Sequence, residues 1–165
     1  MEFEKYLKLF QQAANRIDKN VLREKQLDVA VGEVLDSVFL KLYKKAWTNS
    51  TTNPLTAEAR IFFSVWVNEK TLGEQKIYYN IHAFKLRKLN GYAVESRKFA
   101  NAFRADFKKI EHQWENVRVD FGPLTLMEGW IDWNDESIQQ DVLELANSFM
   151  LMEELIDKSL SMFKK

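Results

Sequence analysis

The most regularly alternating stretch of the chain is Arg60-Ile61-Phe62-Phe63-Ser64-Val65-Trp66-Val67-Asn68. Its β-branched and aromatic residues are those enriched in strands, and successive side chains of a strand point to opposite faces. One face receives Ile61, Phe63, Val65 and Val67, and the other receives Phe62, Ser64, Trp66 and Asn68. The stretch therefore predicts a strand that carries large side chains on both faces.

Further strands are predicted on either side of this one. After a connection containing Gly73, Ile77, Tyr79, Ile81 and Ala83 alternate, and the phase then shifts to Phe84 and Leu86, which predicts a bulge near Ala83. Residues 117–121 also alternate, Gly122-Pro123 breaks them, and residues 124–133 are predicted to return as their neighbour. Residues 35–47 fit both a helical stripe and an alternating strand, and their residue types favour the strand.

Three segments carry the 3.6-residue periodicity of helices. The first spans about residues 2–19, with Phe3, Leu7, Phe10, Ala14 and Ile17 on one side. The second spans about 95–114 and opposes an aromatic face to a basic one. The third spans about 136–163, long enough to cross the body of a small domain.

We expect an α+β fold in which residues 1–165 form a single domain. Its antiparallel sheet of about four to five strands, drawn from residues 37–133, packs against an N-terminal helix, a basic amphipathic middle helix and a long C-terminal helix. Aromatic residues on both faces of the strands favour helices on both faces. The alternative is an open face on which Phe39, Lys41, Tyr43, Lys45 and Trp47, together with Phe62, Trp66, Tyr78 and His82, form a stacking platform for unpaired bases.

Charge is segregated along the chain although the formal total is zero. Residues 76–109 hold nine Lys or Arg against two acidic residues, a net charge of +7, and residues 111–157 hold one Arg against twelve acidic residues, a net charge of −11. Such opposed fields bear on association rather than on the fold.

Basic side chains within residues 85–109 are the candidate anion-binding or partner-binding residues. The middle helix begins with Arg97 and Lys98, although the partial positive charge of a helix N-terminus favours acidic residues there. A bound anion would offset that mismatch, as would neutralisation by Glu95 and the acidic C-terminal helix. The full candidate set is Lys85, Arg87, Lys88, Arg97, Lys98, Arg104 and Lys108.

Catalytic and metal-binding patterns are lacking. His82 and His112 stand thirty residues apart without metal-ligand spacing, and the chain has no Cys, no phosphate-binding glycine loop and no nucleophile elbow. Asp132, Asp135 and Glu136 are candidate acids, but carboxylates at a helix start also suit the helix dipole. We expect no metal and no cofactor.

The first residues are charged and no apolar run approaches a membrane span. We therefore expect a cytoplasmic protein with no membrane partner, and the absence of Cys fits a reducing compartment.

The leading hypothesis is a non-catalytic binding protein whose basic surface engages an acidic partner: another protein, a second copy of this chain or a nucleic-acid backbone. One alternative is a small enzyme with a pocket between the sheet and the basic helix, in which His82 would act as acid or base and Arg97 or Arg104 would hold an anionic substrate. The possible pocket residues are His82, Tyr78 and Trp66. The other is an inhibitor or immunity-type protein that works through an acidic surface formed by Asp132, Asp135, Glu136, Asp141 and Glu144.

Overall fold

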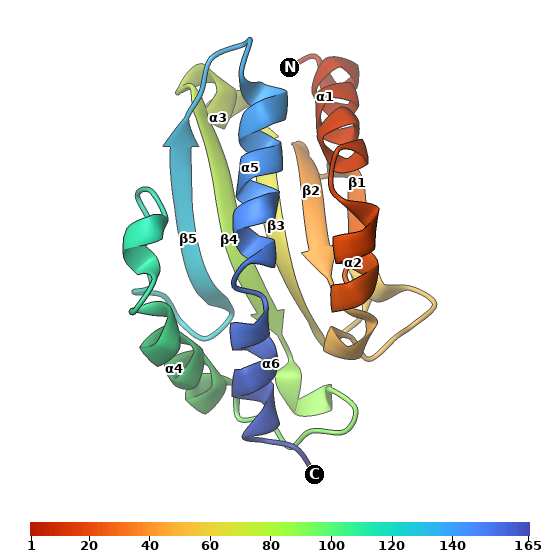
Figure 1. Cartoon of the computed structure of the whole chain (residues 1–165), viewed down its shortest axis with the longest axis vertical. Coiled ribbons are helices and arrows are strands. Elements are labelled where there is room, and N and C mark those ends of the chain that lie inside the picture. Colours follow the sequence, from red (N-terminus) through yellow and green to blue (C-terminus); the bar gives the residue numbers. More distant parts are fainter.

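The structure, a computed structural model that describes all 165 residues, has an α+β fold built on one antiparallel sheet (Figure 1). Each strand pairs with the next one in sequence, in the order β1-β2-β3-β4-β5. Their bounds are β1 (Asp28–Val34), β2 (Ser37–Tyr43), β3 (Arg60–Asn68), β4 (Lys76–Phe84) and β5 (Thr125–Asp132). The strands predicted over 60–68, from residue 77 and over 124–133 are confirmed, as is the strand preference for residues 37–43.

One face of the sheet carries almost all of the helical structure (Figure 1). The helices are α1 (Phe3–Asn15), α2 (Lys19–Lys25), α3 (Glu69–Gly73), α4 (Ser96–Phe107), α5 (Ile138–Met150) and α6 (Glu154–Ser161). Apart from α3, a short helix in the β3–β4 connection, all of them lie on the same side of the strands. The expectation of helices on both faces is therefore wrong. We call the other side the open face.

The core lies between the sheet and these helices. Phe63 on β3 stacks on Phe149 of α5 with ring centroids 4.5 Å apart, and Trp114 packs against Phe63 and Tyr79. The apolar set predicted for residues 61–67 is fully buried here, which fixes the opposite set on the open face. No helix is both long enough and apolar enough to cross a membrane.

The sheet begins earlier in the chain than expected. β1 lies outside the predicted range of residues 37–133, and it is joined to β2 by a tight turn at Leu35, whose φ is 53° and whose side chain is 95% exposed. Positive φ is typical of Gly, Asn or Asp, so a leucine gives no sequence signal for this hairpin. The strand predicted over 117–121 is wrong, because only Arg118 pairs there, with Glu128.

The first predicted helix is shorter than expected, and the last one is divided in two. Within residues 2–19, α1 ends at Asn15. A separate helix, α2, begins at Lys19, and the Asp18 side chain caps it by accepting from the backbone N–H groups of Asn20 and Val21. The long C-terminal helix is interrupted between Met150 and Glu154, although its apolar stripe continues across the break. Glu153, at the break, is buried and its carboxylate lies 2.8 Å from Lys44 Nζ.

Two smaller differences concern the middle of the chain. The basic middle helix, predicted to reach residue 114, ends at Phe107, although Trp114 is still buried in the core. The predicted bulge falls close to its expected place, in the β4–β5 ladder between Ile81 and His82. The extra residue is Leu126 on β5, because Ile81 pairs with Met127 and His82 with Thr125.

Candidate functional site

The open face is organised in rows that run across the strands. The register aligns Lys41 with Ser64, Ser64 with Asn80, and Asn80 with Glu128, so one polar row crosses β2 to β5. An aromatic row lies on one side of it and consists of Phe39, Trp66, Tyr78 and Trp130. On its other side Phe62 pairs with His82. A band of polar groups therefore lies between two bands of rings.

This face is hollowed although no helix covers it. The hollow has a volume of about 510 Å³, and Phe39, Phe62, Ser64 and Asn80 are each less than 8% exposed. We call it the open-face hollow. Its lining residues are Val34, Leu35, Ser37, Phe39, Lys41, Phe62, Ser64, Trp66, Asn68, Asn80, His82, Phe84 and Glu128.

Lys41 is a half-buried lysine without an acidic partner. Its Nζ lies 4.3 Å from the ring centroid of Phe39 and 4.5 Å from that of Phe62, and it takes part in none of the ion pairs of the molecule. Burial, assisted by the positive charge of Arg60, lowers the pKa of Lys41 to about 8. Aromatic faces attract the ammonium, but they do not neutralise it.

Arg60 adds a second cation near Lys41, just outside the residues that line the hollow. Its guanidinium carbon lies 4.8 Å from the ring centroid of Phe84 and 5.7 Å from that of Phe62. Nη1 donates to the carbonyl of Ala57, whereas the buried Nε has no hydrogen-bond partner. Buried polar atoms of native proteins are nearly always paired, so this donor is left unsatisfied at a cost in free energy.

His82 lies between two phenylalanine rings. It stacks on Phe62 with centroids 5.4 Å apart and planes 6° apart, and it lies 5.1 Å from Phe84. Burial and the positive charges of Lys41 and Arg60 lower the pKa of His82 to about 4, so the imidazole is neutral at pH 7. Its buried Nδ1 has no hydrogen-bond partner.

Acceptors stand at the other end of the polar row. Asn80, 3% exposed, donates from Nδ2 to Glu128 Oε1 at 3.3 Å. Because the amide N–H group faces this carboxylate, the amide oxygen is the atom left free, and Oδ1 is buried without a partner. The open-face hollow thus has the Lys41 ammonium at one end, with Arg60 close by, and oxygen acceptors at the other.

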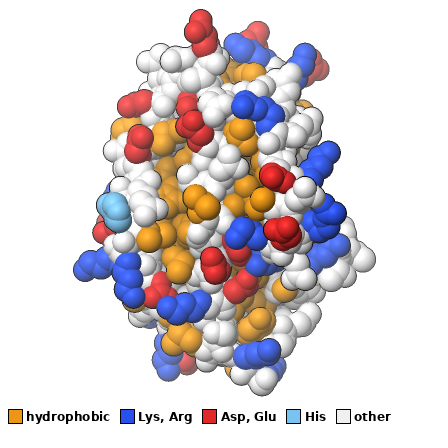
Figure 2. Space-filling model, in the orientation of Figure 1, with side chains coloured by type: hydrophobic (Ala, Val, Ile, Leu, Met, Phe, Trp, Pro, Cys, Tyr) orange, Lys and Arg blue, Asp and Glu red, His pale blue; other side chains and the backbone are white.

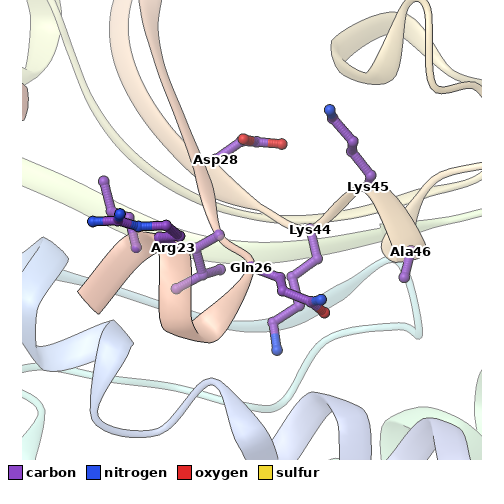
Figure 3. A pocket seen from close by; sticks show the side chains of 8 residues that line it. Arg23, Gln26, Asp28, Lys44, Lys45 and Ala46 are labelled. Atoms are coloured by element: carbon purple, nitrogen blue, oxygen red, sulfur yellow. The ribbon is translucent and has the colours of Figure 1, made fainter. Parts of the chain in front are cut away.

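A second hollow of about 380 Å³ lies between α2 and the short helical turn Lys45–Trp47 (Figure 3). Its basic side chains diverge: Lys44 and Lys45 point in opposite directions. Lys44 Nζ is already 2.6 Å from Asp157 and 2.8 Å from Glu153. This hollow offers no converging, unpaired charge, so the open-face hollow is the stronger candidate.

The predicted basic surface is only partly available to a partner. Lys85 and Lys88 share Glu58, at 3.2 and 2.7 Å, and Lys98 pairs with Glu95 at 2.8 Å. Arg104 donates to the backbone carbonyls of Leu126, Gly122 and Thr125, and so ties α4 to the start of β5. The remaining members, Arg87, Arg97 and Lys108, are exposed and form no ion pair.

The acidic residues proposed as a working surface also lack ion pairs. Asp132, Asp135, Glu136 and Glu144 are exposed, and Asp141 is half-buried. None pairs with Arg97, Arg104 or Lys108. No cluster of three or more acidic or histidine side chains is arranged to hold a metal ion. In Figure 2, Lys and Arg side chains lie among Asp and Glu over much of the helical face and gather both at the lower left, over α4, and at the right edge, near α2.

The proposed pocket residues are brought together, on a face other than the expected one. His82 and Trp66 line the open-face hollow, and Tyr78 stacks on Trp66 with centroids 5.0 Å apart. They lie across the sheet from α4, not between the sheet and that helix. Of the expected stacking platform, Lys45 and Trp47 are absent from the open face, because the chain leaves β2 at Tyr43 and turns.

The sequence did not predict three of the site residues, namely Arg60, Asn80 and Glu128. Each falls at an outward position of an alternating strand, and that position was the only signal available. No family model, curated protein or solved structure matches this chain.

Proposed function

We propose that the protein is a non-catalytic binding protein whose open-face hollow holds a small anionic molecule with an aromatic group. One observation carries the proposal: Lys41 lines the hollow with no carboxylate partner, and Arg60, which packs against the lining rings of Phe62 and Phe84, has a buried Nε with no acceptor. Lys44, whose side chain is 12% exposed, has two carboxylate partners in Glu153 and Asp157.

An anion would remove the electrostatic cost of this arrangement. Two like charges in a partly dry site repel each other, and each loses hydration. A carboxylate, sulfonate or phosphate would accept from Lys41 Nζ and Arg60 Nε, and hydrogen bonds to charged groups contribute about 1.5–3 kcal/mol each.

The rings of the hollow favour an aromatic group on the same ligand. Trp66 and Phe39 lie side by side in one row, and Trp66 is only partly buried, so part of its indole is open to solvent. Stacking of a flat group on such a side chain contributes about 1–3 kcal/mol. A ligand with both features would satisfy the cations and cover the rings together.

His82 supports binding rather than acid–base catalysis. A general acid or base works best when its pKa lies near the operating pH, whereas the pKa of His82 lies at about 4. No carboxylate hydrogen-bonds to its imidazole, so the arrangement that orients a catalytic histidine is missing. A neutral imidazole beside two cations still offers the ligand a hydrogen bond.

The test uses 1-anilinonaphthalene-8-sulfonate, which joins a sulfonate to aromatic rings. We expect the folded protein to bind this probe at one site, followed by probe fluorescence and by quenching of tryptophan fluorescence. Lys41→Met should weaken binding at least tenfold. This substitution makes the hollow more apolar, so a purely hydrophobic attraction would be retained or strengthened by it.

Lys108→Met is the matched control, because Lys108 is an exposed cation on the helical side and forms no ion pair. It should leave probe affinity unchanged. Equal affinities of the wild type and Lys41→Met, with circular dichroism showing both folded, would refute the proposal. An equal loss in both variants would show a general charge effect and would refute it too.

The basic surface supports a second candidate function, the engagement of an acidic partner. The specific observation is that Arg87, Arg97 and Lys108 remain exposed and without ion pairs. If duplex DNA were the partner and these three side chains neutralised phosphates, the logarithm of the binding constant would fall with the logarithm of salt concentration with a slope of about −2.7. An absence of binding at low ionic strength would exclude nucleic acid.

A further inference from the structure

Asn80 and Glu128 define a second recognition end within the same hollow, and the following inference rests on the proposed function. Asn80 Oδ1 is a buried acceptor with no partner, on a residue only 3% exposed. Glu128 lines the hollow and forms no ion pair, and only its Oε1 accepts a hydrogen bond. Two neighbouring acceptors call for two neighbouring donors on the ligand.

The separation of the two ends limits the size of the ligand. Lys41 lies on β2 and Asn80 on β4, two strands away in the same row. Adjacent strands lie about 4.8 Å apart, so the cationic and acceptor ends stand roughly 10 Å from each other. An α-amino acid carries its anion and its donors on adjacent atoms and cannot reach both ends.

The surface between the two ends suits a flat ring. Ser64 lies between Lys41 and Asn80 in the polar row, and its small side chain does not fill the space above the sheet there. Trp66 stands beside it on β3, two residues further along the same face. A ring lying over Ser64 would have the indole at its side and its edge toward Asn80.

We infer that the ligand is a nucleotide-like molecule, whose phosphate binds Lys41 and Arg60 and whose heterocycle presents two adjacent N–H donors to Asn80 Oδ1 and Glu128. A guanine-type edge has this pattern, because its ring N–H and its amino group stand side by side. An adenine-type edge places a ring nitrogen acceptor there, opposite the oxygen acceptors. A hypoxanthine edge keeps the ring N–H and lacks the amino group.

Calorimetric titration of the full chain with guanosine, inosine and adenosine 5′-monophosphates tests this inference. We expect the guanosine compound to bind most tightly and the inosine compound about tenfold more weakly, because the loss of one donor leaves a buried acceptor unpaired. The adenosine compound should bind least tightly, because its ring nitrogen acceptor also faces an oxygen acceptor. Glu128→Gln should weaken guanosine monophosphate about tenfold and reduce its preference over adenosine monophosphate. Probe binding at the cationic end should be unchanged.

Glu33→Gln is the control, since Glu33 is an exposed carboxylate on β1 outside the lining of the hollow. Glu33→Gln should change neither the nucleotide affinities nor the affinity for the sulfonate probe. The inference is overturned if the three nucleotides bind equally or not at all while the sulfonate probe still binds, or if Glu128→Gln weakens nucleotide and probe alike. Failure of the sulfonate probe itself would instead refute the proposed function.

Discussion

The imidazole of His82 lies flat on the ring of Phe62, with centroids 5.4 Å apart and an interplanar angle of 6°. The two residues are paired across β3 and β4, so the sheet register itself holds the stack. The contact places a titratable group within an aromatic cluster and beside two cations.

This stack predicts a loss of stability in mild acid. The pKa of His82 is about 4 in the folded protein and about 6.5 in the unfolded chain, so between these pH values the unfolded chain binds more protons. The free energy of unfolding should therefore be highest above pH 6.5 and should fall as the pH drops toward 4, by roughly 3 kcal/mol at most. Urea unfolding of the wild type and of His82→Phe across this range measures it. Identical pH profiles of the two proteins would contradict the prediction.

From the lowered pKa of Lys41 we predict that anion binding weakens in mild alkali. Its pKa of about 8 means that the ammonium loses its proton near that pH, and an anion binds the protonated form. The affinity for 1-anilinonaphthalene-8-sulfonate should be constant below pH 7 and should fall above about pH 8, by up to tenfold per pH unit. In Lys41→Arg the guanidinium stays charged, so the affinity should stay flat to pH 10. If the affinity of the wild type does not change with pH, Lys41 does not bind the anion.

From the close packing around Gly129 we predict that a single added methyl group strongly destabilises the protein. A Cβ at this position would meet the Tyr79 hydroxyl oxygen, which is hydrogen-bonded to the carbonyl of Glu115. Because Tyr79 is fully buried and has no room to move, Gly129→Ala should lower the free energy of unfolding by about 3 kcal/mol. Gly73→Ala, where a Cβ meets nothing within 4 Å, should change it little. Thermal unfolding of the two variants and the wild type measures these changes in stability.

From the buried ion pair of Lys44 and Glu153 we predict that removal of the Lys44 ammonium destabilises the fold. The side chains of Lys44 and Glu153 are 12% and 5% exposed, and Lys44→Met would leave the Glu153 carboxylate with only the longer contact to Lys25, at 3.4 Å. We expect a loss of about 3 kcal/mol, because an unpaired buried charge is costly. Lys45→Met, at the neighbouring exposed lysine, is the control. In the double variant Lys44→Met, Glu153→Leu, most of the loss should be recovered, and a double variant no more stable than the single one would count against this account.

Much of the fold was predictable because its local patterns are strong. Arg60–Asn68 alternates over its whole length, and α1 and α4 carry clear apolar stripes. Where the prediction was wrong, the local signal was weak or misleading. Leu35 adopts a positive φ without a turn residue, and the stripe of the last helix runs unbroken across a break that a buried ion pair accompanies.

The candidate site was predictable only in part. Position in an alternating strand placed Lys41, Trp66 and His82 on one face, since side-chain direction follows from the local backbone alone. The sequence also determined the α+β class and the middle strand of the sheet. It could not decide which face the helices would cover, because both faces of β3 carry large apolar residues and only three-dimensional packing distinguishes them. The tertiary structure decided that, and it also decided which charges find partners: Lys44 meets Glu153 from more than a hundred residues away, whereas Lys41 and Arg60 meet none.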